Sequence, residues 1–500
     1  MDFANCIRRA TYEAMKIKDI LKRQSNNPNI AISYGNVSAS YENFCKTVEG
    51  HWKKINSIAH NRNVGIFFHN SIDYAIGYFS VAYNDDVIIP LEDTIRPNTL
   101  VSILEYCEIT MVLTNSENYL NLKGMLSDYM YLIDIYNIDT CEVTTAGKGN
   151  RIEQGQDDEE DVAIMLHTSG TTSDPKKVML TNNGLIENIK SNIQSIGITE
   201  DDVCLIVLPM FFGYCNSSQF LTHLYLGARI VIYDGMFNPK KFLSLIDSEK
   251  CTNTTCVPSM LFLIVKGCKR EKYDLSSLRY LCFGGGIMPV EMLKKIILFF
   301  NNTGIIQTYG QTEASPRVTC LLPEDVERKI GSVGKAIPNV TVDIVDKNDN
   351  SVGYEEIGEI VVKGPNVMKG YYKKPDITEK TLRSGWLHTG DLGKFDSEGY
   401  LYIVGRIKNI IISGGLNIYP EEIEEVLINN PNVKETVVVP EPHEILGEVP
   451  VAKIVLKEGV DVNQSDIIQY CLEYLPSNKV PSKVEFCKEL EKTYTGKIKR

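Results

Sequence analysis

The chain lacks several features that would assign it to a class at once. It has no N-terminal signal-peptide core and no uncharged run long enough to cross a bilayer, so we expect neither export nor a membrane span. Its 13 cysteines include no CxxC pair, which is typical of buried thiols in a reducing compartment. The formal net charge of -12 is not interrupted by a basic stripe, so nucleic acid and anionic membrane are poor candidate partners. These absences predict a cytoplasmic protein.

Apolar runs are present instead, and their spacing predicts the fold class. Hydrophobic residues make up 43% of the chain and charged residues 23%, which suits a globular protein with large cores. From Val64 to Thr308, short strand candidates alternate with helical patterns, and this predicts two successive α/β layers on parallel sheets. The strand candidates are 64–68, 87–91, 111–114, 131–135, 162–166, 203–208, 228–233, 279–283 and 305–308.

The pattern of secondary-structure signals in the sequence changes after about Val340. Short strands separated by Gly, Asp and Asn clusters predict a small antiparallel β sheet or barrel. The remaining sequence has helical patterns at 420–428 and 464–474, and strand patterns at 436–439, 451–456 and 484–486. We therefore expect an α/β protein with a large N-terminal domain, residues 1–406, and a small α+β C-terminal domain, residues 407–500.

The run HTSGTTSDPKK, from His167 to Lys177, follows the strand candidate 162–166 and precedes a helix that we expect to begin at Thr181 or Asn182. Hydroxyls, a flexible backbone and a cation in one loop suit the binding of phosphate groups. The residues that supply them are Ser169, Gly170, Thr171, Thr172 and Lys176. The spacing is not that of the Walker sequence, and an ordinary Ser/Thr-rich turn is the alternative interpretation.

Four further stretches are rich in glycine or polar residues where strands are expected to end. FGGG, 283–286, leaves room for a flat aromatic ring against bare backbone. TYGQTE, 308–313, places an aromatic ring, hydroxyls and a carboxylate at a strand's carboxyl end, where open α/β sheets bind ligands. In GWLHTGDLG, Asp391 is suited to accept both ribose hydroxyls, and in GRIKNIIISGG, Arg406 offers donors to the same sugar. Taken singly, each stretch is equally consistent with a tight turn or a capped loop.

Taken together, the order and spacing of these five stretches, with TGKIKR at 495–500, resembles the adenylate-forming superfamily. This superfamily contains acyl-CoA synthetases, aryl-acid ligases, peptide-synthetase adenylation domains and beetle luciferase. The resemblance runs from about residue 25 to Arg500, and YGQTEA, GWLHTGDLG and SGGLNIYPEEIE together are most similar to stand-alone bacterial acid–CoA ligases. It implies that ATP activates a carboxylic acid to an acyl-adenylate, that pyrophosphate leaves, and that coenzyme A takes the acyl group. A mobile C-terminal domain is implied as well.

The resemblance also assigns roles to matching residues. It implies that Lys497 is the catalytic lysine of adenylation, that Thr312 contacts the α-phosphate and that Glu313 ligates Mg2+. Lys408 falls at the hinge between the domains. The other implied contacts are Ser169, Gly170, Thr171, Thr172 and Lys176 to the phosphates; Gly284, Gly285, Gly286 and Tyr309 to adenine; Asp391 and Arg406 to ribose; and Gly414 and Gly415 beside the pantetheine channel.

Four positions outside the acid-binding stretch depart from the usual family pattern, and one of them is Asn409, which replaces the common Asp after the hinge. Ser173 and Lys177 stand where the phosphate loop usually has glycine, and Glu491 stands where the lysine motif usually has proline. We expect altered ATP affinity from the two loop changes, because Ser173 restricts the backbone and Lys177 adds a second cation beside the phosphates.

The stretch LPMFFGYCNSSQF, 208–220, bears on the acid. Many acyl-CoA ligases have histidine at the position of Phe212, which lines the acyl pocket in the family. Phe211, Phe212, Tyr214 and Phe220 predict a hydrophobic acid, aryl or fatty, although the same aromatic residues are equally consistent with a protein core. No Asp lies in this stretch to pair with a substrate ammonium, so an amino acid is a poor candidate.

Two other functions fit the same sequence. One is an acyl-AMP ligase that loads the phosphopantetheine thiol of a separate carrier protein, or forms an amide with an amine. The other is a homologue that binds nucleotide without catalysis, for which the altered loop and Glu491 are the hints.

Overall fold

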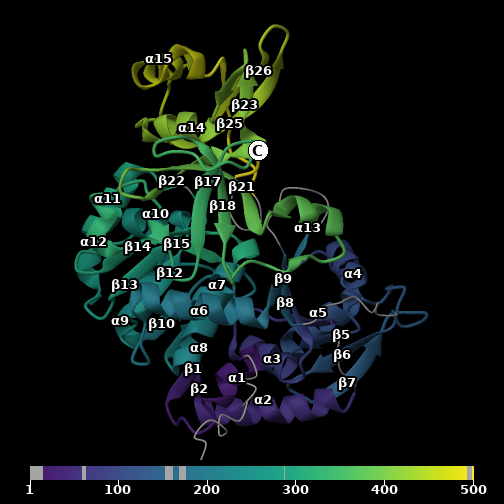
Figure 1. The fold of residues 1–500 in the computed structure, drawn as a ribbon. Helices are drawn as coiled ribbons and strands as arrows, with labels where there is room; N and C mark the ends of the chain where they lie inside the picture. The colour runs from purple at the N-terminus through teal and green to yellow at the C-terminus, as the bar shows by residue number, and fades with distance from the viewer. Residues whose placement is uncertain (1–14, 59–62, 153–160, 168–175, 287, 493–497) are drawn as a thin grey trace, which may run out of the picture.

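The computed structural model describes residues 15–58, 63–152, 161–167, 176–286, 288–492 and 498–500. Figure 1 shows two large sheets with their helices in the lower part of the view, a third sheet above them, and a small C-terminal unit at the top. Over these residues, no helix has both the length and the apolar character needed to cross a membrane.

The first sheet has eight strands in the order β19-β9-β8-β4-β3-β5-β6-β7. Strands β8, β4, β3, β5 and β6 are parallel, whereas β7, β9 and β19 join antiparallel. Both faces of the central strands are buried, which explains their continuous apolar runs. The elements are β3 (Asn63–Phe67), β4 (Val87–Leu91), β5 (Met111–Thr114), β6 (Ile133–Asn137), β7 (Glu142–Ala146), β8 (Val162–His167), β9 (Lys177–Thr181) and β19 (Gly370–Tyr371), with α2 (Tyr41–Asn56), α3 (Ile72–Tyr83), α4 (Pro97–Tyr106) and α5 (Ser116–Met125).

The second sheet has nine strands in the order β16-β15-β14-β13-β12-β10-β11-β1-β2. It is parallel from β14 to β1 and antiparallel at both edges. The strands are β1 (Ile30–Tyr34), β2 (Val37–Ser40), β10 (Val203–Ile206), β11 (Arg229–Ile232), β12 (Asn253–Cys256), β13 (Tyr280–Phe283), β14 (Gly304–Gly310), β15 (Arg317–Leu321) and β16 (Lys335–Ala336). The helices are α1 (Ile17–Lys22), α6 (Asn182–Ile196), α7 (Gly213–Cys215), the π-helix η1 (Asn216–Leu221), α8 (Thr222–Leu226), α9 (Pro239–Glu249), α10 (Pro258–Gly267), α11 (Val290–Phe299), α12 (Pro323–Val326) and the short 3-10 turns η2 (Arg270–Lys272) and η3 (Thr312–Ala314).

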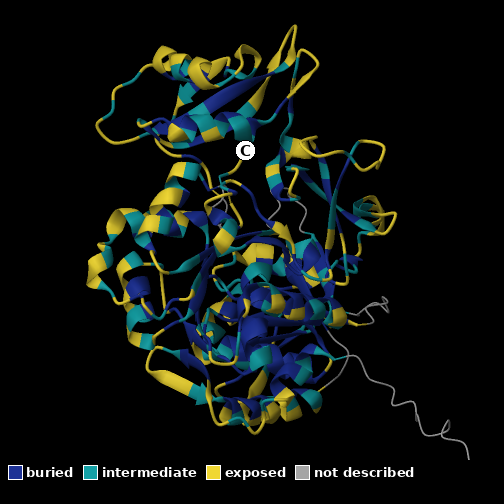
Figure 2. Ribbon diagram, turned by 60° about the vertical axis from the view of Figure 1, so that its left-hand side comes forward, coloured by how far each residue is buried: buried dark blue, intermediate teal, exposed yellow. Residues whose placement is uncertain are grey.

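Helix α6 lies next to both sheets, and its ends are specified locally. Thr181 caps it by accepting a hydrogen bond from the Gly184 amide at 3.0 Å, and the helix ends at Gly197, whose φ of 66° suits glycine. Its apolar face contributes to one large core that both sheets share, visible as the dark blue interior of Figure 2. The two α/β layers are therefore packed as a single body.

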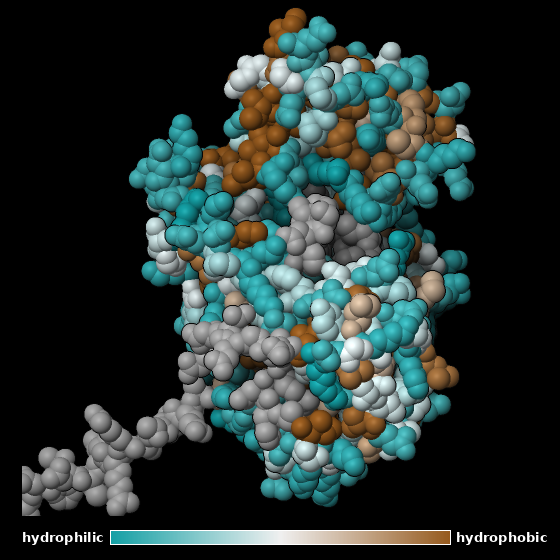
Figure 3. Space-filling model, turned by 90° about the vertical axis from the view of Figure 1, so that its right-hand side faces the viewer, coloured by the Kyte–Doolittle hydropathy of each residue, from teal (hydrophilic) through white to brown (hydrophobic). Residues whose placement is uncertain are grey.

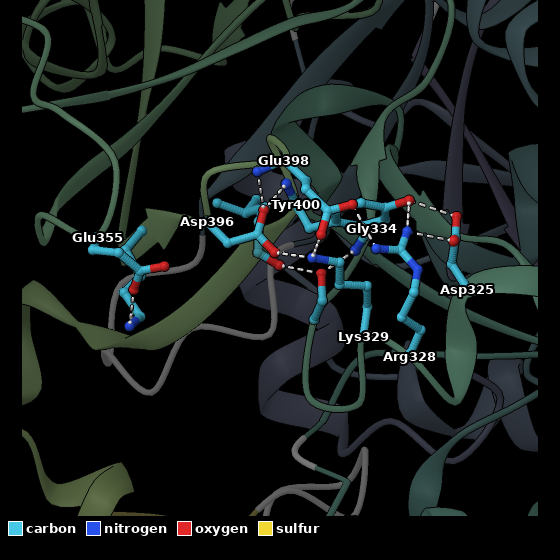
Figure 4. A network of polar contacts seen from close by, with 11 residues as sticks. Asp325, Arg328, Lys329, Gly334, Glu355, Asp396, Glu398 and Tyr400 are labelled. Carbon is cyan, nitrogen blue, oxygen red and sulfur yellow. Dashed lines mark hydrogen bonds and ion pairs between the residues drawn. The ribbon is translucent and has the colours of Figure 1, made fainter.

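The third sheet is antiparallel and covers the edge of the second. Its elements are β17 (Thr341–Val345), β18 (Gly358–Lys363), β20 (Leu382–Arg383), β21 (Trp386–Phe395) and β22 (Leu401–Arg406), with α13 (Pro375–Thr381). Figure 4 shows the ion-pair network that fastens its β21–β22 turn to the loop after β15. Lys329 Nζ lies 2.6 Å from both Asp396 and Glu398, and Tyr400 donates a hydrogen bond to Asp325 at 2.6 Å.

The C-terminal unit has its own sheet and its own core. Strands run in the order β24-β23-β26-β25, with β27 parallel to β26. One face of the sheet is covered by α14 and α15, which bury Ile423, Leu427 and Ile467 against it. The elements are η4 (Ile407–Asn409), β23 (Ile411–Ser413), β24 (Leu416–Ile418), α14 (Pro420–Asn429), β25 (Val433–His443), β26 (Gly447–Leu456), α15 (Gln464–Tyr474), η5 (Ser477–Lys479) and β27 (Lys483–Phe486).

The structure confirms the α/β class, the small antiparallel sheet and the α+β C-terminal unit. The strands predicted at 87–91 and 111–114 coincide with β4 and β5, and the helix predicted at 464–474 coincides with α15. Several strands of the two large sheets were not predicted: β1, β2, β7, β9, β12, β15, β16 and β19. Strand β9 lies between the phosphate loop and α6, so the loop connects two antiparallel strands instead of a strand and a helix. Strand β12 was missed because its sequence, NTTC, has no apolar run.

Arg500 fastens the last described residues to α14. Its guanidinium lies 3.0 Å from Glu421 and 2.7 Å from Glu424, and the Glu424 side chain is only 12% exposed. Burial raises the pKa of Glu424 to about 7, and Arg500 opposes this rise without cancelling it.

This raised pKa predicts how stability depends on pH. An unfolded glutamate titrates near ~4.3, so between that pH and about 7 the folded state holds a proton that the unfolded state releases. Stability is therefore lost as pH rises through this window. Glutamine does not titrate, so Glu424→Gln should not lose stability in this way. The difference in free energy of unfolding, variant minus unsubstituted protein, should therefore be about 2 to 3 kcal/mol larger at pH 7.5 than at pH 4.5. Urea unfolding at a series of pH values measures this. Glu425→Gln, at an exposed neighbour, should follow the unsubstituted protein; parallel pH curves for Glu424→Gln would contradict the prediction.

Candidate active site

The phosphate loop leaves the first sheet at the β8–β9 pair, where His167 and Lys177 are opposite each other. Ser169, Gly170, Thr171, Thr172 and Ser173 lie outside the described residues. Lys176 is described, and its Nζ lies 5.2 Å from the centre of the Tyr371 ring.

Lys177, the next residue, has a different environment from the one expected. Its side chain is only 1% exposed, and burial lowers its pKa. Lys176 precedes β9 and its Nζ lies over the Tyr371 ring, whereas Lys177, the first residue of β9, is buried in the interior. The expectation that Lys177 adds a second cation beside the phosphates is wrong: only Lys176 faces Tyr371.

Glu313 sits in the turn η3 immediately after β14. It accepts a hydrogen bond from the Tyr371 hydroxyl at 2.8 Å, and burial raises its pKa. A polar cavity of about 290 Å³ opens beside it; among its lining residues are Gln311, Lys380, Arg383, His388 and Thr389. A half-buried carboxylate that is costly to ionise without a counter-ion is chemically suited to a divalent cation. Glu313 therefore fits Mg2+.

His388 lines the same cavity and is held by its neighbours. Its Nδ1 lies 2.9 Å from Glu359 Oε2, and Arg383 donates to its Nε2 at 3.1 Å. Glu359 also accepts the Gly390 amide at 3.1 Å. These contacts fix the turn that precedes Asp391.

Asp391 is the centre of the polar contacts predicted for ribose. It is opposite Arg406 in the β21–β22 pair, and Arg406 Nε lies 2.7 Å from its Oδ1. The Tyr309 hydroxyl, from β14, donates to its Oδ2 at 2.8 Å. Burial and the nearby carboxylate raise the pKa of Tyr309, so this hydroxyl remains a donor. The structure thus brings together three residues separated by up to ninety-seven positions in sequence (309 to 406).

Gly284 follows β13, and its lack of a side chain is required by its surroundings. A Cβ there would lie 2.6 Å from the Thr308 carbonyl oxygen, 2.7 Å from Thr308 Oγ1 and 3.2 Å from the Tyr214 hydroxyl. Gly285, with φ of 77°, is exposed, as is Gly286. These glycines leave a bare strip of backbone beside Tyr309, as adenine would need.

The aromatic residues proposed for the acid fall into two groups. Phe220 is fully buried and packs against Tyr74, Tyr78 and Phe79, so for this residue the alternative interpretation, a protein core, is the correct one. Phe211 and Phe212 are partly exposed, with ring centres 4.7 Å apart. The Tyr214 hydroxyl lies 2.6 Å from Thr308 Oγ1, and a Cβ on Gly213 would lie 3.7 Å from Thr312 Cγ2. The segment carrying Phe212 and Tyr214 therefore begins beside Thr312.

Lys408, which the sequence predicts to be a hinge residue, lies in η4, between β22 and the C-terminal unit. Burial lowers its pKa, and Arg406, Lys176 and Arg500 lower it further, while Asp391 acts in the opposite sense. Cationic side chains from the phosphate loop, the ribose site and the hinge thus gather within electrostatic reach of one another. Lys497 lies outside the described residues.

Gly414 and Gly415 form the two-residue turn between β23 and β24. Their φ angles of 56° and 82° are those of a type I′ hairpin turn, and the Gly414 amide donates to the Leu446 carbonyl at 2.8 Å. Figure 3 shows apolar side chains gathered on the upper, C-terminal unit. Around this turn the exposed ones are Ile412, Leu416, Ile445 and Leu446.

Sequence reasoning missed Tyr371 and Glu359. Both are ordinary strand residues in sequence, and only tertiary pairing places them beside Glu313 and His388. A third missed residue, Arg317, is fully buried close to Tyr214.

The fold and site are those of an adenylate-forming enzyme: two packed α/β layers, an aspartate–arginine pair beside a tyrosine, a half-buried glutamate, and a small C-terminal unit. Residues 24–372 match the family model "AMP-binding enzyme", and residues 422–497 match "AMP-binding enzyme C-terminal domain". The chain belongs to the AMP-binding enzyme family.

Known relatives agree with this membership. A feruloyl-CoA synthase of Amycolatopsis sp is 34% identical over 374 residues, covering 72% of this chain and 75% of that protein. A 2-succinylbenzoate–CoA ligase of Bacillus mycoides is 32% identical over 445 residues, covering 88% and 87%. The o-succinylbenzoate CoA synthetase of Bacillus subtilis, solved with its acyl-adenylate intermediate, has a TM-score of 0.84 at 27% identity and 97% coverage of both chains. Another structure of that enzyme is a complex with ATP and a magnesium ion.

These findings confirm the prediction of an AMP-forming acid–thiol ligase that uses ATP, Mg2+ and coenzyme A.

Proposed function

We propose that this enzyme activates a hydrophobic carboxylic acid to an acyl-adenylate and transfers the acyl group to coenzyme A. The observation that carries the proposal is the convergence of Tyr309, Asp391 and Arg406 beside Gly284 and Glu313. An adenosine placed there would have its base on bare backbone, its ribose on Asp391 and its phosphates toward Lys176.

The chemistry requires two anions, the acid and the α-phosphate, to approach each other while negative charge grows on departing pyrophosphate. Lys176 supplies positive charge at the phosphate loop, Thr312 supplies a hydroxyl beside the acid segment, and Lys497 would act on the α-phosphate. Glu313, held by Tyr371, would ligate Mg2+, which neutralises phosphate charge when bound. An aryl or fatty acid would lie along Phe211, Phe212 and Tyr214.

We also propose that residues 407–500 move as a domain about Lys408 between the two half-reactions. The separate core of the C-terminal unit supports this proposal, because a unit with its own core can rotate without unfolding. After the movement, the Gly414–Gly415 turn would approach the thiol channel. Its glycines leave room for a narrow pantetheine arm.

The acceptor is coenzyme A in the relatives named above, and this supports a thioester product here. A carrier-protein thiol or an amine is the alternative acceptor. We place the enzyme in the cytoplasm, since twelve cysteines of the described chain, most of them buried, are free thiols.

Acid-dependent exchange of labelled pyrophosphate into ATP tests the first half-reaction. Across aryl, short-chain and long-chain acids, we expect exchange with aryl or longer-chain acids and little with short-chain ones, because only the former fill the aromatic segment. Product analysis by mass spectrometry, with CoA alone or with a carrier protein in its place, then identifies the acceptor. ATP binding without exchange for any acid would contradict the proposal and favour the non-catalytic homologue.

A further inference from the structure

Arg317, the first residue of β15, is a buried cation that the site described above does not use. Its side chain is 2% exposed and is among the largest fully buried side chains of the protein. It lies opposite Gly310 in the β14–β15 pair, one residue beyond Tyr309. It is therefore close to the nucleotide site, and its side chain points toward helix α6.

The guanidinium has neutral neighbours. It donates to the side-chain oxygen of Asn192 on α6, and in the described part of the chain no Asp or Glu forms an ion pair with it. Burial raises the pKa values of Tyr214 and Cys282, and Arg317 opposes both rises, which places its charge beside these two groups. Both remain uncharged at neutral pH. A buried cation with only neutral partners is expensive, and proteins retain one where an anion can meet it.

Unsatisfied polar atoms occur both on Arg317 and along the neighbouring helical segment. Among the described residues, buried side-chain atoms without a hydrogen-bond partner include Arg317 Nε, Asn216 Nδ2, Gln219 Oε1 and His223 Nε2. The last three lie on or next to the π-helix η1, which contacts α6. Buried polar groups are nearly always satisfied, and π-helical turns are frequent at functional sites. Arg317, buried and with its Nε unpaired beside this segment, is therefore a better candidate for ligand binding than for stability.

We call residues 211–218, which carry the aromatic side chains proposed to contact the acid, the acid segment. Arg317 and Asn192 lie at the end of this segment that is farther from Thr312. Gly213 lies beside Thr312, where the acid's reacting carboxylate must meet the α-phosphate. The chain then runs through Tyr214 to Ser218, whose carbonyl accepts a hydrogen bond from Asn192 at 3.1 Å. Asn192 is the residue that Arg317 contacts. A substrate laid along this segment would reach Arg317 with its other end.

We propose that Arg317 binds a carboxylate at the far end of the acid substrate, so that the enzyme activates one carboxyl group of an acid whose body is hydrophobic and whose other end is anionic. The inference rests on the proposed function and narrows its substrate class. The tyrosine and the phenylalanines would contact the body of the acid, and Arg317 with Asn192 would receive the distal carboxylate.

Matched pairs of acids test this without any substitution. The pairs are 4-phenylbutanoate and its ortho-, meta- and para-carboxylated forms, and nonanoate and nonanedioate, each with the distal carboxamide as a neutral isostere. For at least one pair, the dicarboxylate should have a kcat/KM in pyrophosphate exchange about 10²-fold above both neutral partners, since a site built for a charged group rejects the analogue that lacks it.

Two substitutions assign the effect to Arg317. Arg317→Met keeps the bulk and removes the charge, so the preference should be lost or reversed in favour of neutral acids. Arg317→Lys should retain part of it. Arg270→Met is the matched control. Arg270 donates a hydrogen bond to the nearby Tyr273 carbonyl and lies outside the acid segment, so this variant should keep the full preference. Thermal unfolding and ATP binding establish that each variant is folded.

The outcomes separate the two levels of the proposal. If neutral acids are activated as well as or better than every dicarboxylate, the role of Arg317 is wrong and the ligase assignment stands. Equal loss with all acids in folded Arg317→Met has the same meaning, because it shows a purely structural arginine. If no acid supports exchange, the proposed function itself fails.

Discussion

Lys497→Ala should lower acid-dependent pyrophosphate exchange by about 10²- to 10³-fold, the usual effect of removing one preorganised cation or donor from a developing charge. The acid and the α-phosphate are both anions, so loss of the ammonium raises the barrier of the first half-reaction directly. ATP binding should change much less, because Lys176, Asp391 and Arg406 are intact.

The second half-reaction distinguishes this role from a general loss of structure. If the C-terminal domain withdraws Lys497 before the thiol attacks, the variant should still convert a synthetic acyl-adenylate and CoA to acyl-CoA at close to the original rate. Lys499→Ala, two residues away and paired with Glu491, is the control for charge in the same segment. Equal losses in both half-reactions would contradict the assignment.

Asp391→Ala should lower kcat/KM for ATP by about 10²-fold. Two hydrogen bonds from ribose to a buried carboxylate would be lost, each worth about 1.5 to 3 kcal/mol when charge-assisted. The substitution also leaves Arg406 and the Tyr309 hydroxyl without the oxygen atoms that they now contact at 2.7 and 2.8 Å. Most of the effect should be on KM, because the contact is present before and during the reaction.

A ribose-specific readout separates binding from stability. The unsubstituted enzyme should use ATP at least about 10-fold better than 2′-deoxy-ATP, and Asp391→Ala should lose this discrimination, since the acceptor of the 2′-hydroxyl is gone. Asp376→Ala, at an exposed position in the first turn of α13, should retain it. Unchanged discrimination in Asp391→Ala would place the ribose elsewhere.

Local sequence was sufficient to predict a strand where the segment itself contains a continuous apolar run. Continuous apolar runs gave β4 and β5, because strands of a parallel sheet are buried on both faces. Strand β12, with Asn and Thr side chains, is equally buried, yet only its neighbours β10 and β13 make it a strand. Strand β9 was missed because it begins with a buried lysine, which no local pattern predicts.

The order of short motifs along the chain was enough to determine the class of enzyme and to name the residues around the nucleotide, since each motif supplies its own backbone freedom and polar groups. Tertiary structure alone decided which of those residues meet. It directs Lys177 into the interior and Lys176 toward Tyr371, places Phe220 in the core, and surrounds Arg317 with neutral groups. Such contacts join residues that are far apart in sequence, and their energies depend on burial and on neighbouring charges that no single segment contains.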